Sequence, residues 1–120
     1  MSSETVMEHA AQPYHLGGAA GMPVVGREGA PGEGPYMTVG LRLESGLIAE
    51  ARFETYGCPS AIACGSWMTR WMEGRQPEST LVLEAGDLVK LLGLPLGKEH
   101  VAVLAVKALN LAVGEWRRRR

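Results

Sequence analysis

Cysteine is scarce in this 120-residue sequence, which has only Cys58 and Cys64. Two cysteines so close together exclude the disulfide framework that stabilises many small secreted domains. The first twelve residues carry acidic side chains and no apolar core, so they do not predict a secretory leader. We therefore expect a cytoplasmic protein in which both thiols are reduced.

Long apolar runs and a broad basic surface are also lacking. The longest apolar stretch, Val101–Val113, is interrupted by Lys107 and Asn110, whereas a membrane span needs about 20 apolar residues. Four of the twelve basic residues are the arginines at 117–120, which leaves a chain body richer in acidic residues. These arginines suit the negative end of a last helix. We expect neither a membrane nor a nucleic-acid partner.

The length and a hydrophobic content of 46 % suit one globular domain over residues 1–120. Ser3 is positioned to cap a short helix that ends near Gln12. The stretch from Leu16 to Pro35 is rich in glycine and proline. We expect little regular structure over most of that stretch, which we interpret as a loop lying over the domain.

Strand signals follow this loop. Period-two alternation predicts an antiparallel hairpin over residues 37–55, with Ser45-Gly46 as its turn. In strict alternation Ile48 shares a face with Glu50, and Phe53 points to the other face.

Helix signals occupy the second half of the chain. Apolar residues at helical spacing predict a helix from about Ala61 to Gly74, a short one over 87–92, and a long one over 99–116. Strands followed by helices indicate an α+β fold, with a small antiparallel sheet of about three strands and helices packed on one face.

Cys58 is the first candidate for chemistry. Gly57 precedes it at the exit of the second predicted strand, Pro59 follows it, and a helix is expected to begin within a few residues. Backbone N–H groups at a helix start favour a thiolate, which is both a soft metal ligand and a nucleophile towards sulfur. The alternative is a small, half-buried turn residue without chemistry.

Three further residues have weaker claims. Six helical positions turn Cys64 about 600° away from Cys58, so it fits a core position beside Trp67 better than a shared metal site. His100 is placed to reach a loop cluster from the first turn of the last helix, although lone histidines are often surface residues. Glu33, between two glycines, is either solvated or a hard ligand on a mobile loop.

Four segments together resemble one known family. Residues 51–63 contain F-E-T-Y-G-C-P-S-A-I-A, which is similar to the signature around the middle cysteine of the IscU/NifU iron–sulfur cluster assembly scaffolds. Residues 6–17 resemble the family's N-terminal helix and its end. Residues 29–34 are similar to its cysteine loop, and residues 94–101 to its L-P-P-V-K-x-H-C motif. The resemblance covers nearly the whole chain.

The sequence departs from the family at three ligand-loop positions. Glu33 replaces a cysteine, Pro35 an aspartate and Val101 the last cysteine, so that Cys58 and His100 are what remains of the ligand set. The resemblance marks Leu94, Pro95 and Lys98 as a partner-docking loop. Altered residues at Leu96 and Gly97 weaken the case for a dedicated chaperone.

The resemblance implies a scaffold-like protein, not an enzyme, with Cys58 as sulfur acceptor and a cysteine desulfurase as partner. Its cargo or cofactor would be an iron–sulfur cluster, or a single zinc or iron ion held by Cys58, His100 and Glu33, with Cys64 as the remotest candidate; no metal at all is also open. One alternative is a paralogue without a cluster that acts as adaptor or regulator of the desulfurase. Another is a sulfur-transfer module with Cys58 as nucleophile and His100 as general base.

Overall fold

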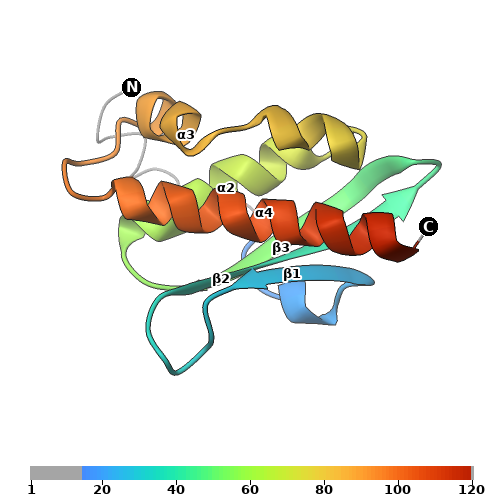
Figure 1. Cartoon of the computed structure of the whole chain (residues 1–120), viewed down its shortest axis with the longest axis horizontal. Coiled ribbons are helices and arrows are strands. Elements are labelled where there is room, and N and C mark those ends of the chain that lie inside the picture. Colours follow the sequence, from blue (N-terminus) through green and yellow to red (C-terminus); the bar gives the residue numbers. More distant parts are fainter. Residues whose placement is uncertain (1–14, 120) are drawn as a thin grey trace.

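The structure is a computed structural model, and it describes residues 15–119 (Figure 1). Three strands form one antiparallel sheet in the order β1-β2-β3. The elements are η1 (Ala19–Gly21), β1 (Val24–Glu28), β2 (Tyr36–Glu44), β3 (Leu47–Tyr56), α2 (Pro59–Met72), η2 (Pro77–Val82), α3 (Ala85–Leu92) and α4 (Glu99–Arg119). The expected α+β fold is confirmed, while the helix predicted before Gln12 lies outside the described residues.

The predicted hairpin is confirmed as β2 and β3. Ser45 and Gly46 both adopt positive φ angles, 55° and 80°, which is the backbone geometry of a tight turn between twisted strands. The expected face of Ile48 was wrong, because the register shifts between Arg42 and Leu43. This bulge leaves Ala49 outside the pairing and turns Ile48 into the core, where it is fully buried together with Phe53.

Strand β1 lies inside the stretch where the sequence predicted little regular structure. It pairs with β2, and Gly26 is opposite Val39. A side chain at Gly26 would place its Cβ 2.1 Å from the backbone nitrogen of Ala112, so α4 crosses β1 in direct backbone contact. The glycine that suggested a loop is therefore a packing site between a strand and a helix.

Helices α2 and α4 cover one face of the sheet, and α3 packs against α4 (Figure 1). The core between the layers is built from the inward residues of β2 and β3 and from small residues of both helices, with Met37, Leu41, Phe53, Met68 and Leu109 fully buried. On the opposite face, η1 packs on β2, where a Cβ at Gly40 would meet the carbonyl oxygen of Ala19 at 2.3 Å.

The helix boundaries follow recognisable local signals. Helix α2 begins at Pro59, two residues before the expected start near Ala61, and Gly93 in the left-handed conformation ends α3, as the sequence predicted. Helix α3 begins two residues before the predicted Asp87, because Asp87 accepts the Glu84 N–H at 2.9 Å in a capping box. None of the helices between residues 15 and 119 combines the length and the apolar character that a membrane span requires.

Both ends of the edge strand β3 are contacted by segments that are not strands. The Phe53 N–H donates to the His15 carbonyl oxygen at 2.9 Å, and the Gly17 N–H donates to the Phe53 carbonyl oxygen at 2.7 Å. The Arg52 guanidinium also donates to the carbonyl oxygens of Leu16 and Gly17. At the other end, Ile48 exchanges backbone hydrogen bonds with residues 74–75.

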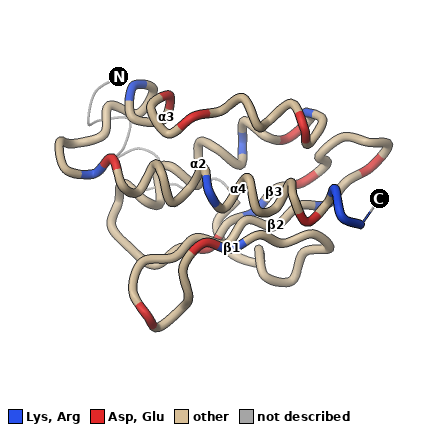
Figure 2. The backbone as a smooth tube through the Cα atoms, viewed as in Figure 1, with Lys and Arg blue, Asp and Glu red and all other residues tan. Residues whose placement is uncertain are grey.

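Charges of both signs are spread along the described chain, and basic residues gather at the end of α4 (Figure 2). Arg117 pairs with Glu78 of η2 at 3.0 Å, and Arg119 pairs with Glu115 at 2.8 Å. Arg119 also donates to the Pro23 carbonyl oxygen near β1. These arginines therefore join the last helical turn to neighbouring segments, where a cation also complements the helix dipole.

Candidate functional site

Cys58 occupies the junction between sheet and helices. Strand β3 ends at Tyr56, Gly57 makes the bend with φ 155°, and Cys58 is the N-cap residue of α2. Pro59 follows at the first helical position, where its missing N–H costs nothing. The sequence predicted this placement from Gly57 and Pro59, and the structure confirms it.

The pKa of the Cys58 thiol is lower than its ordinary value. Partial burial acts to raise the pKa, but the backbone N–H groups of Ala61 and Ser60 and the ammonium of Lys98 together outweigh it. The Lys98 ammonium acts both as a nearby charge and as a hydrogen-bond donor to the sulfur. A larger share of Cys58 is therefore a nucleophilic thiolate near neutral pH than of a free cysteine.

A pocket of about 200 Å³ opens beside this thiol. Its walls come from the end of β3 and the start of α2, and from the turn before α4 and the first turns of α4 itself: Tyr56, Cys58, Ala61, Lys98, His100 and Leu104. Backbone hydrogen bonds shape the turn, since the Lys98 N–H donates to the Pro95 carbonyl oxygen at 3.0 Å. The fold thus brings Cys58 and His100 to one pocket, as the resemblance implied, and adds Lys98.

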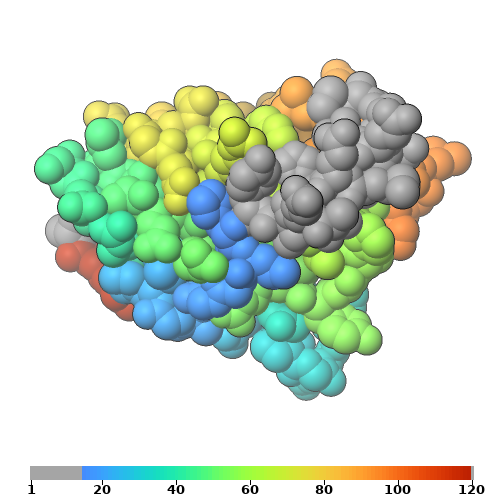
Figure 3. Space-filling view, turned by 180° about the vertical axis from the view of Figure 1, so that it is seen from behind, coloured from blue at the N-terminus to red at the C-terminus, as the bar shows by residue number. Residues whose placement is uncertain are grey.

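Glu33 lies close to this pocket but does not line it. It is exposed on the loop between β1 and β2, whose Gly32 and Gly34 share a neighbouring hollow of about 310 Å³ with Tyr56. Seen from behind, this loop (cyan) projects beside the turn that carries Cys58 (light green) (Figure 3). Pro35, at the end of the loop, does reach the Cys58 pocket.

The donor set around Cys58 is small. No group of three or more His, Cys, Asp and Glu side chains within residues 15–119 is placed to hold a metal ion. Val101 forms part of the pocket wall and is 4 % exposed, so an apolar side chain stands where the resemblance implied a cysteine. An iron–sulfur cluster needs four ligands, mostly thiolates, whereas the potential donors among the side chains that line this pocket include only one thiol, Cys58, and one imidazole, His100.

Cys64 is separated from this site. It is fully buried in the core. Its burial, and to a smaller extent the charge of the nearby Cys58, raise the pKa of its thiol to about 12. Such a thiol stays protonated and inert at neutral pH. The structure thus places it at the core position that helical spacing favoured.

The resemblance gave Lys98 to a partner-docking loop with Leu94 and Pro95 and did not foresee its contact with Cys58. The signal available in the sequence was its place two residues before His100 in the L-P-L-G-K-E-H segment. Leu96, in the same loop, is 98 % exposed. The loop therefore presents an apolar tip to solvent and a cation to the pocket.

Trp67 and Trp71 were also not recognised as a surface feature. The sequence placed Trp67 beside Cys64 in the core, but it is half-buried and lies stacked on Trp71, with ring centroids 6.0 Å apart. Their spacing of four residues on a helix was the available signal.

Curated proteins similar to this chain carry names from iron–sulfur cluster assembly. The iron-sulfur cluster assembly scaffold protein IscU of Azotobacter vinelandii is 37 % identical over 122 residues, with 98 % of this chain and 95 % of that protein covered. The iron sulfur cluster assembly protein 1 of Trachipleistophora hominis is 32 % identical over 118 residues, with 96 % and 86 % covered.

Solved structures agree in fold. A nitrogen-fixing NifU-like protein (N-terminal) from Brucella abortus superposes with a TM-score of 0.72 at 17 % identity, covering 98 % of this chain and 94 % of that one. A putative scaffold protein for the SUF system from Fervidobacterium islandicum superposes with a TM-score of 0.67 at 15 % identity, covering 92 % and 94 %. Residues 1–120 match the family described as NifU-like N terminal domain, and the chain therefore belongs to that family.

Proposed function

We propose that this protein is a scaffold-type component of iron–sulfur cluster assembly, in which Cys58 accepts sulfur from the persulfide of a cysteine desulfurase. The observation that carries the proposal is a cysteine at a helix N-terminus, beside Lys98, in an open pocket. The names of the relatives support a role in iron–sulfur cluster assembly, and the environment of the Cys58 thiol supports its role as sulfur acceptor.

The chemistry needs no oxidant or metal. The Cys58 thiolate attacks the outer sulfur of the donor's cysteine persulfide. One sulfur–sulfur bond breaks in the donor, whose cysteine leaves as a thiolate, and another forms on Cys58. The negative charge of the attacking thiolate leaves on the donor's cysteine, and Cys58 carries the transferred sulfur as a persulfide. Loss of the proton from that terminal sulfur gives an anion, which Lys98 is placed to balance.

Metal loading is the second part of the proposal. Cys58 and His100 would supply one soft and one intermediate ligand, and Glu33 would have to approach from its exposed loop. This set suits a single iron or zinc ion completed by water better than a cluster on one chain. Iron and sulfide are cargo in this scheme, and Cys58 would be their point of attachment.

The first test is sulfur transfer. The protein is incubated with a cysteine desulfurase and cysteine under anaerobic conditions, and intact mass is measured before and after reduction. We expect a mass gain of one sulfur atom that Cys58→Ser abolishes and Cys64→Ala leaves unchanged. A gain that persists in Cys58→Ser, or no gain in the wild type, would reject Cys58 as the acceptor.

Metal content then separates scaffold from adaptor. The two-donor pocket specifically favours the alternative of a relative without a cluster that regulates the desulfurase. Reconstitution with iron and sulfide should load the wild type and not Cys58→Ser if the protein is a scaffold. If the protein binds the desulfurase but neither the wild type nor Cys58→Ser takes up iron and sulfide, the adaptor hypothesis is favoured.

A further inference from the structure

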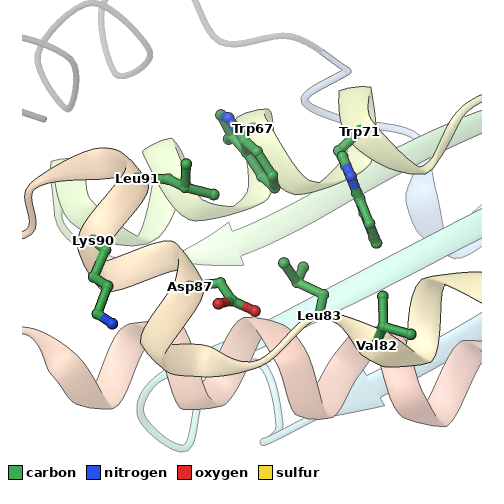
Figure 4. Close-up of a pocket in the computed structure, with 7 residues that line it drawn as sticks. All are labelled: Trp67, Trp71, Val82, Leu83, Asp87, Lys90 and Leu91. Atoms are coloured by element: carbon green, nitrogen blue, oxygen red, sulfur yellow. The ribbon is translucent and has the colours of Figure 1, made fainter.

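Another hollow, of about 360 Å³, lies on the helical layer and shares no lining residue with the Cys58 pocket. It is a groove between α2 on one side and η2 and α3 on the other (Figure 4). Its apolar walls are Trp67 and Trp71 from α2, Val82 and Leu83 from the end of η2, and Leu91 from α3. We call it the tryptophan groove.

Apolar side chains in this groove remain in contact with water. Val82 is 71 % exposed and Leu91 is 38 % exposed, and both tryptophans are half-buried. An exposed apolar cluster that includes aromatic residues is typical of a protein interface rather than of an ordinary surface. Nothing in the proposed sulfur chemistry requires these residues.

The tryptophans are already ordered for binding. Trp67 and Trp71 stack with an interplanar angle of 16°. The Arg75 guanidinium lies 4.4 Å from the Trp71 ring centroid, and its Nε donates to the Trp71 carbonyl oxygen at 2.8 Å. Rings held in this way lose little conformational entropy when a partner covers them, which makes them good anchors.

The charged residues of the groove indicate what covers it. Asp87 and Lys90 both line it and lie three positions apart on α3, so they are neighbours on one helix face. A partner of a single charge sign would face one of them with a like charge. A second copy with antiparallel α3 helices would place Asp87 of each chain opposite Lys90 of the other, with the apolar walls between them.

We propose that the tryptophan groove is a two-fold interface at which two copies of this chain associate. A two-fold contact requires one patch that is complementary to itself, and an apolar centre beside one acid and one base meets that requirement. The groove and the Cys58 pocket share no lining residue. Failure of the sulfur-transfer test therefore leaves this proposal standing, and the reverse also holds.

The test is sedimentation velocity on the full chain over a wide range of protein concentration. We expect a reversible monomer–dimer equilibrium for the wild type. Val82→Glu should weaken association at least about tenfold, because it brings an unpaired charge into the interface. The matched control is Val103→Glu on α4, where the valine is 42 % exposed and outside the groove, and it should dimerise as the wild type does.

Charge exchange tests the orientation. Lys90→Glu alone and Asp87→Lys alone should each weaken self-association, since each dimer would then oppose like charges. An equimolar mixture of the two variants should associate, because every cross-chain pair is again of opposite sign. Circular dichroism checks that Asp87→Lys, which removes a capping acceptor of α3, remains folded.

Three outcomes would overturn the proposal. They are a wild type that stays monomeric at every concentration, equal effects of Val82→Glu and Val103→Glu, and a variant mixture that associates no better than its separate components. The first outcome would assign the groove to a different occupant.

Discussion

The two cysteines of this chain meet opposite environments, although Cys58 is the N-cap residue of α2 and Cys64 lies within the same helix. Cys58, at the start of the helix, faces an open pocket, backbone N–H groups and the Lys98 ammonium, and its thiol pKa is lowered. Cys64 is enclosed by the core, and burial raises its pKa to about 12. One helix thus holds a reactive thiol and an inert one, and position rather than residue type decides between them.

The largest expected effect is in alkylation of the native protein. Cys58 should react directly with iodoacetamide, whereas Cys64 should react only through unfolding and so at least about a thousandfold more slowly. Peptide mapping after a timed reaction measures both rates. Cys58→Ala should abolish labelling of the native state, and Cys64→Ala should leave it unchanged. Similar rates at the two thiols would show that the contrast is absent in solution.

A substitution at Gly65, next to Cys64, should reduce the difference in reactivity between the two thiols by loosening the core around Cys64. A Cβ at this position would lie 2.3 Å from the Phe53 ring, which is itself fully buried. We expect Gly65→Ala to lower the free energy of unfolding by about 1–2 kcal/mol, because overpacking outweighs the gain in helix propensity. Urea unfolding measures this change, and faster labelling of Cys64 should accompany it.

Gly114 is the matched control for that substitution. It lies in α4, and a Cβ there would meet nothing within 4 Å. Gly114→Ala should therefore raise stability by about 0.5–1 kcal/mol. If Gly65→Ala raised stability to the same extent, the packing of α2 against Phe53 would be looser than the structure indicates.

The smallest expected effect is on the reactivity of Cys58, and it tests why this thiol differs from Cys64. Lys98→Met removes the cation that lowers the pKa of Cys58, so the pKa rises and less thiolate is present at neutral pH. Alkylation should slow by roughly twofold to fivefold, as for removal of one exposed charge. The alkylation rate of Cys58 rises with pH in the wild type and in Lys98→Met. The difference between the two rates should vanish at a pH where Cys58 is fully ionised in both proteins.

Lys107→Met is the control, because it removes an exposed lysine from α4 that is not among the groups acting on Cys58. Its pH–rate profile should overlay that of the wild type. A Lys98→Met profile displaced to lower pH would contradict the assignment of Lys98 as the stabilising charge.

The fold features that could be predicted from the sequence are those with local causes. Alternation and Ser45-Gly46 specify the β2–β3 hairpin, and Pro59 and Gly93 mark helix boundaries. The face of Ile48 could not be predicted, because the bulge beside Leu43 depends on the pairing of two strands. Strand β1 could not be predicted, because Gly26 is needed for close packing against α4, and that helix lies about ninety positions further along the chain.

The candidate site divides in the same way. The neighbours Gly57 and Pro59 predict that Cys58 lies near a helix start. The core position of Cys64 follows from helical rotation. The contact of Lys98 with Cys58 joins segments forty residues apart and exists only once α4 has packed on the sheet. The same is true of the tryptophan groove, whose walls come from three elements.

The backbone contacts along β3 have a consequence for the protein at high concentration. An exposed sheet edge is a template on which another chain can add a strand, and this is a common first step towards aggregation. Here the segment His15–Gly17 and residues 74–75 occupy hydrogen-bonding positions on the outer edge of β3. Release of the first segment would uncover the backbone of β3 around Phe53. These few hydrogen bonds therefore occupy edge positions on which another chain could otherwise add a strand, and they do so separately from any role in the chemistry of Cys58.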